Sequence, residues 1–151
     1  MTYNWIDISK YIVNIFNINW SPISHLKLQK ILYYTEWRSL AILNNSIVNF
    51  EFEARINWPV CRNIYNEFKI YWFDDLPNFE LDKKLNLEEN DISLINEVIS
   101  KYWKLSARDL VNLSHSEEPR IKARSWLINT DIWTAIIQKE IMKNYFKMQI
   151  S

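Results

Sequence analysis

The histidine at position 115 is the side chain that most strongly suggests chemistry in this sequence. His115 lies in the segment LSHSEEP, next to several acidic residues, and Asp109 precedes it in the chain. A histidine can act as a general acid or base when a carboxylate orients it within hydrogen-bond reach of a substrate. Asp109 or Glu117 could provide that carboxylate, which would make the protein a small hydrolase. Because the helical pattern breaks between Asp109 and His115, we favour a histidine that holds a loop through hydrogen bonds.

Neither the other histidine nor the single cysteine completes a metal site. His25, Cys61 and His115 show none of the spacings that are typical of zinc ligands. Cys61 is expected in a helix among apolar residues, where a free cysteine is usually an unreactive small hydrophobic residue. The sequence therefore predicts no metal, no cofactor and no catalytic residue.

Positive and aromatic side chains alternate along the segment 24–43. Lys27, Lys30 and Arg38 are interleaved there with Tyr33 and Tyr34. Such a pattern could bind nucleic acid, since aromatic rings stack on bases and lysines contact phosphates. The formal net charge is +0, with 18 basic and 18 acidic residues, so we expect no basic face. We favour lysines at the rim of a helix and tyrosines in the core.

The segment 24–43, SHLKLQKILYYTEWRSLAIL, is the element that must organise the rest of the chain. Ser24 suits the N-cap of a helix. Apolar residues recur on almost every side of the helix that would follow. This pattern is typical of a helix that neighbours cover on several sides. Charged residues interrupt the segment too often for a membrane span. We therefore expect a mainly α fold, a single compact domain over residues 1–151 around this buried helix.

The other elements follow from the spacing of apolar residues and from capping residues. Alternating apolar and charged residues predict a short extended segment or hairpin near 47–57. Ser106 and Asp109 form a capping box that predicts a short helix through Leu113. The remaining predictions are helices over 6–17, from Pro59 onward and over 87–103, a loop over 72–86, and a helical turn within 118–125. A last helix is expected after a cap at 129–131, and the residues on its core face are Ile132, Ile136, Ile137, Ile141 and Tyr145.

The amino-acid composition is unusual in one respect. Glycine is absent although tryptophan occurs 8 times, whereas average usage predicts roughly ten glycines in a chain of this length. Every backbone position with positive φ must therefore be occupied by a residue other than glycine.

No leader sequence and no apolar run of about 18 residues is present, so we expect a cytoplasmic protein.

Three segments together resemble a known family. They are LKLQKILYY (26–34), EARINWPVCRNIYNEFK (53–69) and LSARDLVNLSHSEEPRIKAR (105–124). In this order and spacing they resemble the Panacea domain, a family that includes SocA-like and phage-associated proteins. The resemblance extends over about residues 8–146. It implies a structural or toxin-facing role for the motif positions Leu28, Gln29, Lys30, Tyr33, Tyr34, Pro59, Val60, Tyr65, Ser106, His115 and Pro119.

The resemblance implies an antitoxin of a toxin–antitoxin system, without catalysis. Family members neutralise a protein toxin, usually encoded by a neighbouring gene, by direct binding, and some act as adaptors that hand the bound toxin to a protease. We therefore expect a cognate toxin as partner, a protease as a second partner in the adaptor case, and no membrane contact. The alternative is a phage-associated regulatory or nucleic-acid-binding module, also without catalysis.

The departures from the family pattern are systematic. Tryptophan stands where the family has glycine, at Trp37, Trp58 and Trp103, and arginine stands where the family has tryptophan, at Arg38, Arg55 and Arg120. Some bacterial lineages read the UGA codon as glycine and some CGN codons as tryptophan. We hypothesise that the gene uses such a code, so that these residues are glycine and tryptophan respectively. Arg38 supports this hypothesis, because we expect apolar neighbours around it in the central helix.

Overall fold

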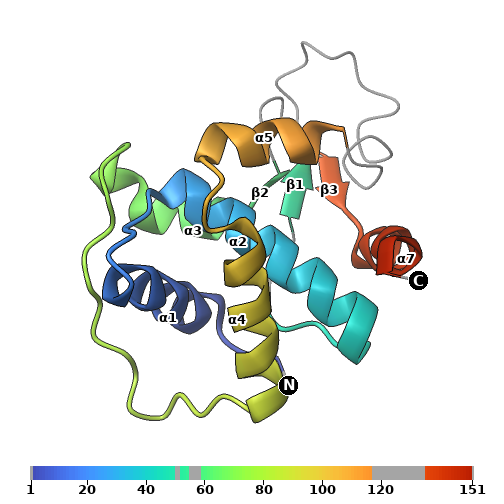
Figure 1. The fold of residues 1–151 in the computed structure, drawn as a ribbon, viewed down its shortest axis with the longest axis horizontal. Coiled ribbons are helices and arrows are strands. Elements are labelled where there is room, and N and C mark those ends of the chain that lie inside the picture. The colour runs from blue at the N-terminus through green and yellow to red at the C-terminus, as the bar shows by residue number, and fades with distance from the viewer. Residues whose placement is uncertain (1, 50–51, 55–58, 117–134, 151) are drawn as a thin grey trace.

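The computed structural model describes residues 2–49, 52–54, 59–116 and 135–150, and Figure 1 shows their arrangement. The helices are α1 (Trp5–Ile18), α2 (His25–Arg38), the π-helical turn η1 (Ser39–Leu43), α3 (Arg62–Phe68), the 3₁₀ turn η2 (Lys69–Tyr71), α4 (Glu89–Tyr102), α5 (Ala107–His115) and α7 (Lys139–Ile150). The strands are β1 (Phe52–Ala54), β2 (Pro59–Val60) and β3 (Ala135–Ile137). The mainly α fold class predicted from the sequence is confirmed.

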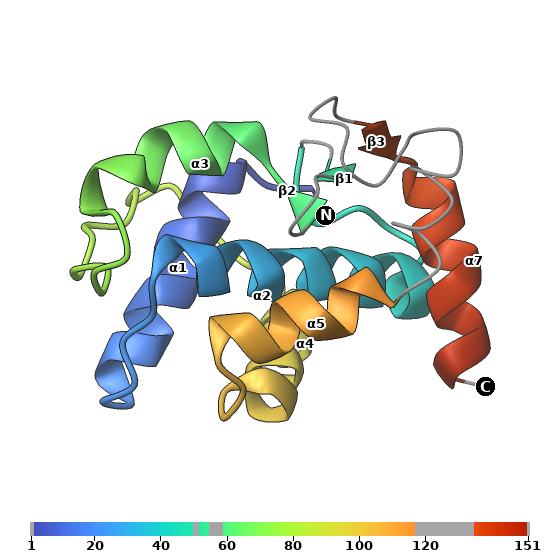
Figure 2. The same ribbon diagram turned by 90° about the horizontal axis from the view of Figure 1, so that it is seen from above.

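Helix α2 is the centre of the fold, as predicted. Ser24 caps it, because its Oγ accepts a hydrogen bond from the backbone N–H of Lys27 at 3.4 Å. Every residue of α2 except Leu26 and Arg38 is buried. Helices α1, α3, α4, α5 and α7 all contact α2. Figure 2 shows α1 and α3 near one end of α2 and α7 at the other, with the sheet and α4–α5 on opposite sides.

Aromatic rings attach the neighbouring helices to α2. Phe146 of α7 stacks on Trp37 with ring centroids 4.1 Å apart. Tyr102 of α4 stacks on Tyr34 at 4.5 Å. Tyr33 contacts Phe146 edge-on at 6.1 Å, so the two tyrosines lie in the core as predicted. Such ring pairs contribute about 0.5–1.5 kcal/mol each beyond the area they bury.

The helices predicted over 6–17 and 87–103 are confirmed as α1 and α4, and the predicted loop over 72–86 has no helix or strand. The capping box is also confirmed. The backbone N–H of Asp109 donates to Ser106 Oγ at 3.1 Å, and the N–H of Ser106 donates to Asp109 Oδ2 at 3.0 Å. Helix α5 extends to His115, two residues beyond the predicted end at Leu113.

A small antiparallel sheet of order β2-β1-β3 corrects two predictions. The helix expected from Pro59 begins at Arg62 instead, because Pro59 pairs with Ala54 of β1. A proline can lie in β2 because that strand is at the edge of the sheet, where a missing N–H is tolerated.

The start of the last helix is the second correction. Ile136 and Ile137, expected on its core face, form strand β3 opposite Glu53 and Phe52, and α7 begins only at Lys139. Branched side chains suit a paired strand, and this tertiary pairing overrides the helical spacing. Strand β1 confirms the extended segment predicted near 47–57. Ile132, the cap at 129–131 and the turn at 118–125 lie outside the described residues.

Candidate functional site

Asp109 and His115, the pair on which a hydrolase would depend, both lie in α5. Asp109 lies in the first turn of α5 and His115 is the last residue of that helix. Six residues of α-helix separate them by about 9 Å along the axis. The Asp109 carboxylate also accepts from Ser106, and these hydrogen bonds hold its pKa below its usual range. Asp109 therefore serves as a helix cap, while Glu117 lies outside the described residues.

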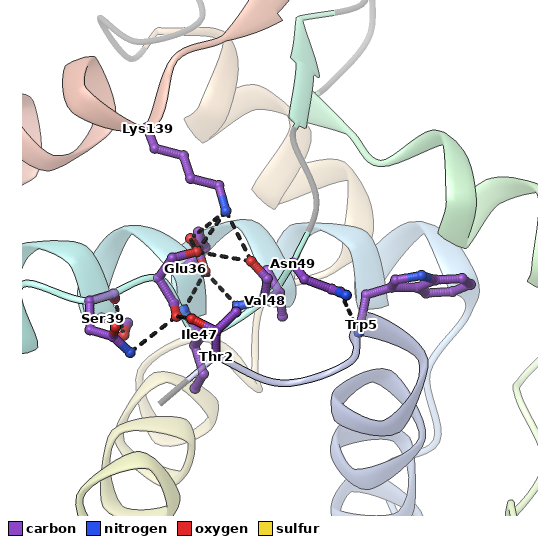
Figure 3. A network of polar contacts seen from close by, with 10 residues as sticks. Thr2, Trp5, Glu36, Ser39, Ile47, Val48, Asn49 and Lys139 are labelled. Carbon is purple, nitrogen blue, oxygen red and sulfur yellow. Dashed lines mark hydrogen bonds and ion pairs between the residues drawn. The ribbon is translucent and has the colours of Figure 1, made fainter.

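Glu36 is the polar residue around which the structure converges, and sequence reasoning missed it as a site. Its side chain is fully buried in α2 and accepts hydrogen bonds from the backbone N–H groups of Ile47 at 3.0 Å and Val48 at 3.2 Å. The hydroxyl of Ser46 donates to Glu36 Oε1 at 2.5 Å, and Lys139 Nζ lies 3.1 Å from the same oxygen. Figure 3 shows these contacts.

Lys139 completes this network from α7. Its ammonium group also donates to Ser46 Oγ at 2.6 Å and to the carbonyl oxygen of Val48 at 2.9 Å. The segment that Glu36 holds pairs in turn with the N-terminal residues, since the N–H of Tyr3 donates to the carbonyl of Ile47 at 2.8 Å. The network therefore ties α2, the segment after η1, α7 and the N-terminus together. Its carboxylate is occupied by fixed donors, so its role is to position elements of the fold.

The lysines of α2 are buried, which corrects the prediction that they lie at a helix rim. Lys27 is 9 % exposed and Lys30 is 1 % exposed. Lys27 Nζ donates to the carbonyl oxygen of Trp103 at 2.6 Å and lies 5.4 Å from the ring of Phe16. Burial lowers the pKa of Lys27. The side chain can be buried because it reaches a carbonyl at the end of α4, which the sequence pattern could not show.

Arg38 also differs from its expected surroundings. Its guanidinium donates through Nε and Nη2 to the two carboxylate oxygens of Glu97 in α4, and its side chain is 16 % exposed. Arg38 is thus a paired charge near the surface, so the argument that it is misplaced was wrong. With Lys27 and Lys30 buried and Arg38 paired, these three cations form no phosphate-binding face.

A groove lined mainly by apolar and aromatic side chains lies at the N-terminal end of α2. It has a volume of about 640 Å³ and is lined by His25, Leu26, Tyr65, Lys69, Ile70, Trp72 and Phe73. Ile70 is 70 % exposed and Phe73 is 77 % exposed. Surface apolar side chains gathered around a hollow are typical of a site where a protein partner binds.

His25 forms the fixed wall of this groove. Its Nδ1 lies 3.4 Å from Gln29 Nε2, and its ring meets that of Tyr65 edge-on at 5.9 Å. With the Gln29 amide nitrogen as donor, Nδ1 is the acceptor of a neutral ring. Burial lowers the pKa of His25, which favours this neutral ring at neutral pH.

The motif positions divide between the core and the surface. Leu28, Gln29, Lys30, Tyr33 and Tyr34 are buried in α2. Tyr65 is 42 % exposed and lines the groove, and Ser106 caps α5. Pro59 and Val60 form β2, His115 ends α5, and Pro119 lies outside the described residues. Among the motif positions that the structure describes, Tyr65 lines the groove itself and Gln29 contacts its wall through His25.

The described residues show neither a metal-binding cluster nor a membrane-spanning helix. No group of three or more His, Cys, Asp or Glu side chains there is placed to hold a metal ion. None of the helices in the same part of the chain has the length and apolar character needed to cross a membrane. Cys61 is buried, as predicted for a structural cysteine.

Comparison with known proteins adds one finding. The family described as antitoxin SocA-like, Panacea domain, matches residues 28–120, which is more than half of the chain. This match confirms the resemblance drawn from the sequence motifs. Searches of curated proteins and of solved structures find no match.

Proposed function

Because the chain belongs to the SocA-like, Panacea-domain antitoxin family, we propose that it is an antitoxin that neutralises a cognate protein toxin by direct binding. The family match over residues 28–120 is the observation that carries this proposal. The geometry is consistent with it, since Asp109 is committed to capping α5 and the Glu36 carboxylate is occupied by fixed donors. On this proposal the toxin is encoded by a neighbouring gene and is bound in the cytoplasm.

The groove beside His25 is the surface that we propose for toxin binding. Ile70 and Phe73 present large exposed apolar side chains, and Tyr65 adds an aromatic ring with a polar tip. Interfaces between proteins concentrate their binding energy in a few aromatic and apolar anchors of this kind. His25 and Gln29 hold the groove wall from a buried helix, so the anchors stand on a rigid base. An apolar segment of the toxin is the expected occupant.

Growth rescue tests the antitoxin function. The neighbouring genes are expressed one at a time in a test host, with and without this protein. We expect one of them to arrest growth alone and to permit growth when this protein is co-expressed. If no neighbouring gene is both toxic and rescued, the proposed function is wrong.

Matched surface variants test the binding surface. Ile70→Ser with Phe73→Ser removes two groove anchors, and Met148→Ser removes an apolar side chain that is 75 % exposed in α7, at the other end of α2. We expect the double variant to bind toxin at least about tenfold more weakly, because loss of a hot-spot residue costs about 2 kcal/mol or more. Met148→Ser should bind as the unmodified chain does. Equal binding by the double variant would exclude the groove while leaving the antitoxin function standing.

The half-life of the toxin separates simple blocking from delivery to a protease. In the adaptor case the toxin disappears faster when this protein is present, and the loss stops when the protease is inactivated. In the blocking case the toxin accumulates in complex with this protein. Direct binding is common to both cases, so a stable complex would identify this protein as a blocker, and a toxin that is degraded whenever rescue occurs would identify it as an adaptor.

A further inference from the structure

Two tryptophans occupy backbone conformations that suit glycine. Within the described residues the positions with positive φ are Trp20 at 56°, Asn44 at 54° and Trp72 at 52°. Asparagine tolerates this region, whereas a bulky residue there brings Cβ against the backbone. Tryptophan at two of the three positions therefore needs a specific explanation.

Trp20 completes the C-terminal cap of α1. The N–H of Ser21 donates to the carbonyl of Phe16 at 3.0 Å, and the N–H of Trp20 donates to the carbonyl of Asn17 at 3.1 Å. These two bonds form the Schellman motif, in which the residue after the cap is left-handed and is usually glycine. Trp20 is that residue, with φ 56°. Its side chain is 93 % exposed, so no packing of the indole compensates for the conformation.

Trp72 occupies the corresponding position of a tight turn. The N–H of Asp74 donates to the carbonyl of Tyr71 at 2.9 Å, which makes Trp72 the first central residue of a β-turn. Its φ of 52° and ψ of −123° are the values of a type II′ turn, where that position is dominated by glycine. The Trp72 side chain is 72 % exposed, so packing does not impose this conformation either.

From this geometry we propose that positions 20 and 72 are glycine in the protein made by its own cells, and that their codons are UGA read as glycine. The composition agrees independently, because the sequence has 0 glycines and 8 tryptophans. A standard bacterial reading has no sense codon at UGA, and a table that assigns UGA to tryptophan writes tryptophan for every glycine that UGA encodes. Both anomalies follow together when the gene uses UGA and no GGN codon for glycine. The proposal does not rest on the antitoxin function.

The backbone restricts how far the proposal extends. Trp103 has φ −61°, and Trp37 lies within α2 with its ring stacked on Phe146. Neither position requires glycine, and Trp58, Arg55 and Arg120 lie outside the described residues. Glycine at position 72 would leave Ile70 and Phe73 in the groove, so the proposed anchors for the toxin are the same under either residue.

Paired glycine and alanine substitutions test the conformational part. Trp20→Gly is compared with Trp20→Ala, and Trp72→Gly with Trp72→Ala, by chemical unfolding of the full chain. Both members of a pair remove the indole, and only alanine retains the Cβ that clashes at positive φ. We expect each glycine variant to have a folding equilibrium constant about five- to tenfold above its alanine partner. At a position with negative φ the order is reversed, so alanine variants that equal or exceed the glycine variants at both sites would overturn the proposal.

The codons and the native protein test the identity directly. We expect UGA at codons 20 and 72, and fragment mass spectra of the protein from its own cells should show glycine at both positions. UGG at both codons, or tryptophan in those spectra, would refute the proposal whatever the stability of the variants. Because neither measurement involves a toxin, failure here is distinguishable from failure of the proposed function.

Discussion

Replacing Glu36 with alanine should destabilise the protein more than any surface substitution. The carboxylate is fully buried and accepts from the N–H groups of Ile47 and Val48, from Ser46, and from Lys139 of α7. Glu36→Ala would leave two buried backbone donors without their acceptor. It would also remove the buried carboxylate that pairs with Lys139, so that the ammonium group of Lys139 loses its counter-ion.

The expected loss follows from these contacts. Each buried donor left without an acceptor costs about 1–3 kcal/mol, and the charge left unpaired, on Lys139, is 27 % exposed and so adds less than a fully buried charge would. These terms overlap, and Lys139 retains Ser46 Oγ and the Val48 carbonyl, so we expect a total loss of about 3–5 kcal/mol. Domains are commonly stable by only about 5–15 kcal/mol, so this loss is large. It corresponds to a fall in Tm of roughly 6–20 °C for a chain of this size.

Urea unfolding followed by circular dichroism measures the effect, and Glu97→Ala is the matched control. Glu97 also pairs with a basic side chain, Arg38, but its own side chain is 57 % exposed. Exposed ion pairs contribute about 0–1 kcal/mol, so the control should lose less than 1 kcal/mol. If Glu36→Ala also lost less than 1 kcal/mol, the network would not hold the fold together and the reasoning would fail.

Two further substitutions test the groove wall and the helix cap. Burial lowers the pKa of His25 below the unfolded value of about 6.5, so its contribution to stability is complete above that pH and is lost as pH falls toward the folded pKa. His25→Gln should therefore flatten the decline in unfolding free energy as pH falls below about 6.5, and an unchanged decline would contradict this. Ser106→Ala should lower the free energy of unfolding by about 1 kcal/mol, because it removes the acceptor of the Asp109 N–H, whereas Ser106→Thr should lower it less. Urea unfolding measures both losses, and equal losses would exclude capping as the cause.

The elements that depend on local residues could be predicted from the sequence. Ser24 and the capping box of Ser106 and Asp109 are local hydrogen-bond patterns, and the structure has both. The near-complete burial of α2 also follows from its own apolar residues on all sides. These features require no knowledge of distant partners.

The features that depend on distant partners could not be predicted. Glu36 reads as an interruption of an apolar helix, because Lys139 follows it by about a hundred residues in the chain. The burial of Lys27 depends on the carbonyl of Trp103, and strand β3 depends on pairing with β1. The groove was missed for the same reason, since α2 and η2 supply different walls of it. Residue spacing carries no information on such contacts.

The position of α7 has a consequence for how the chain is synthesised. Phe146 stacks on Trp37 and Lys139 reaches Glu36, so the last helix covers a part of α2 that leaves the ribosome much earlier. Until Lys139–Ile150 emerges, the C-terminal half of α2 lacks its cover and exposes apolar surface to chaperones and proteases. A chain terminated before Lys139 should therefore be degraded as an incompletely folded product.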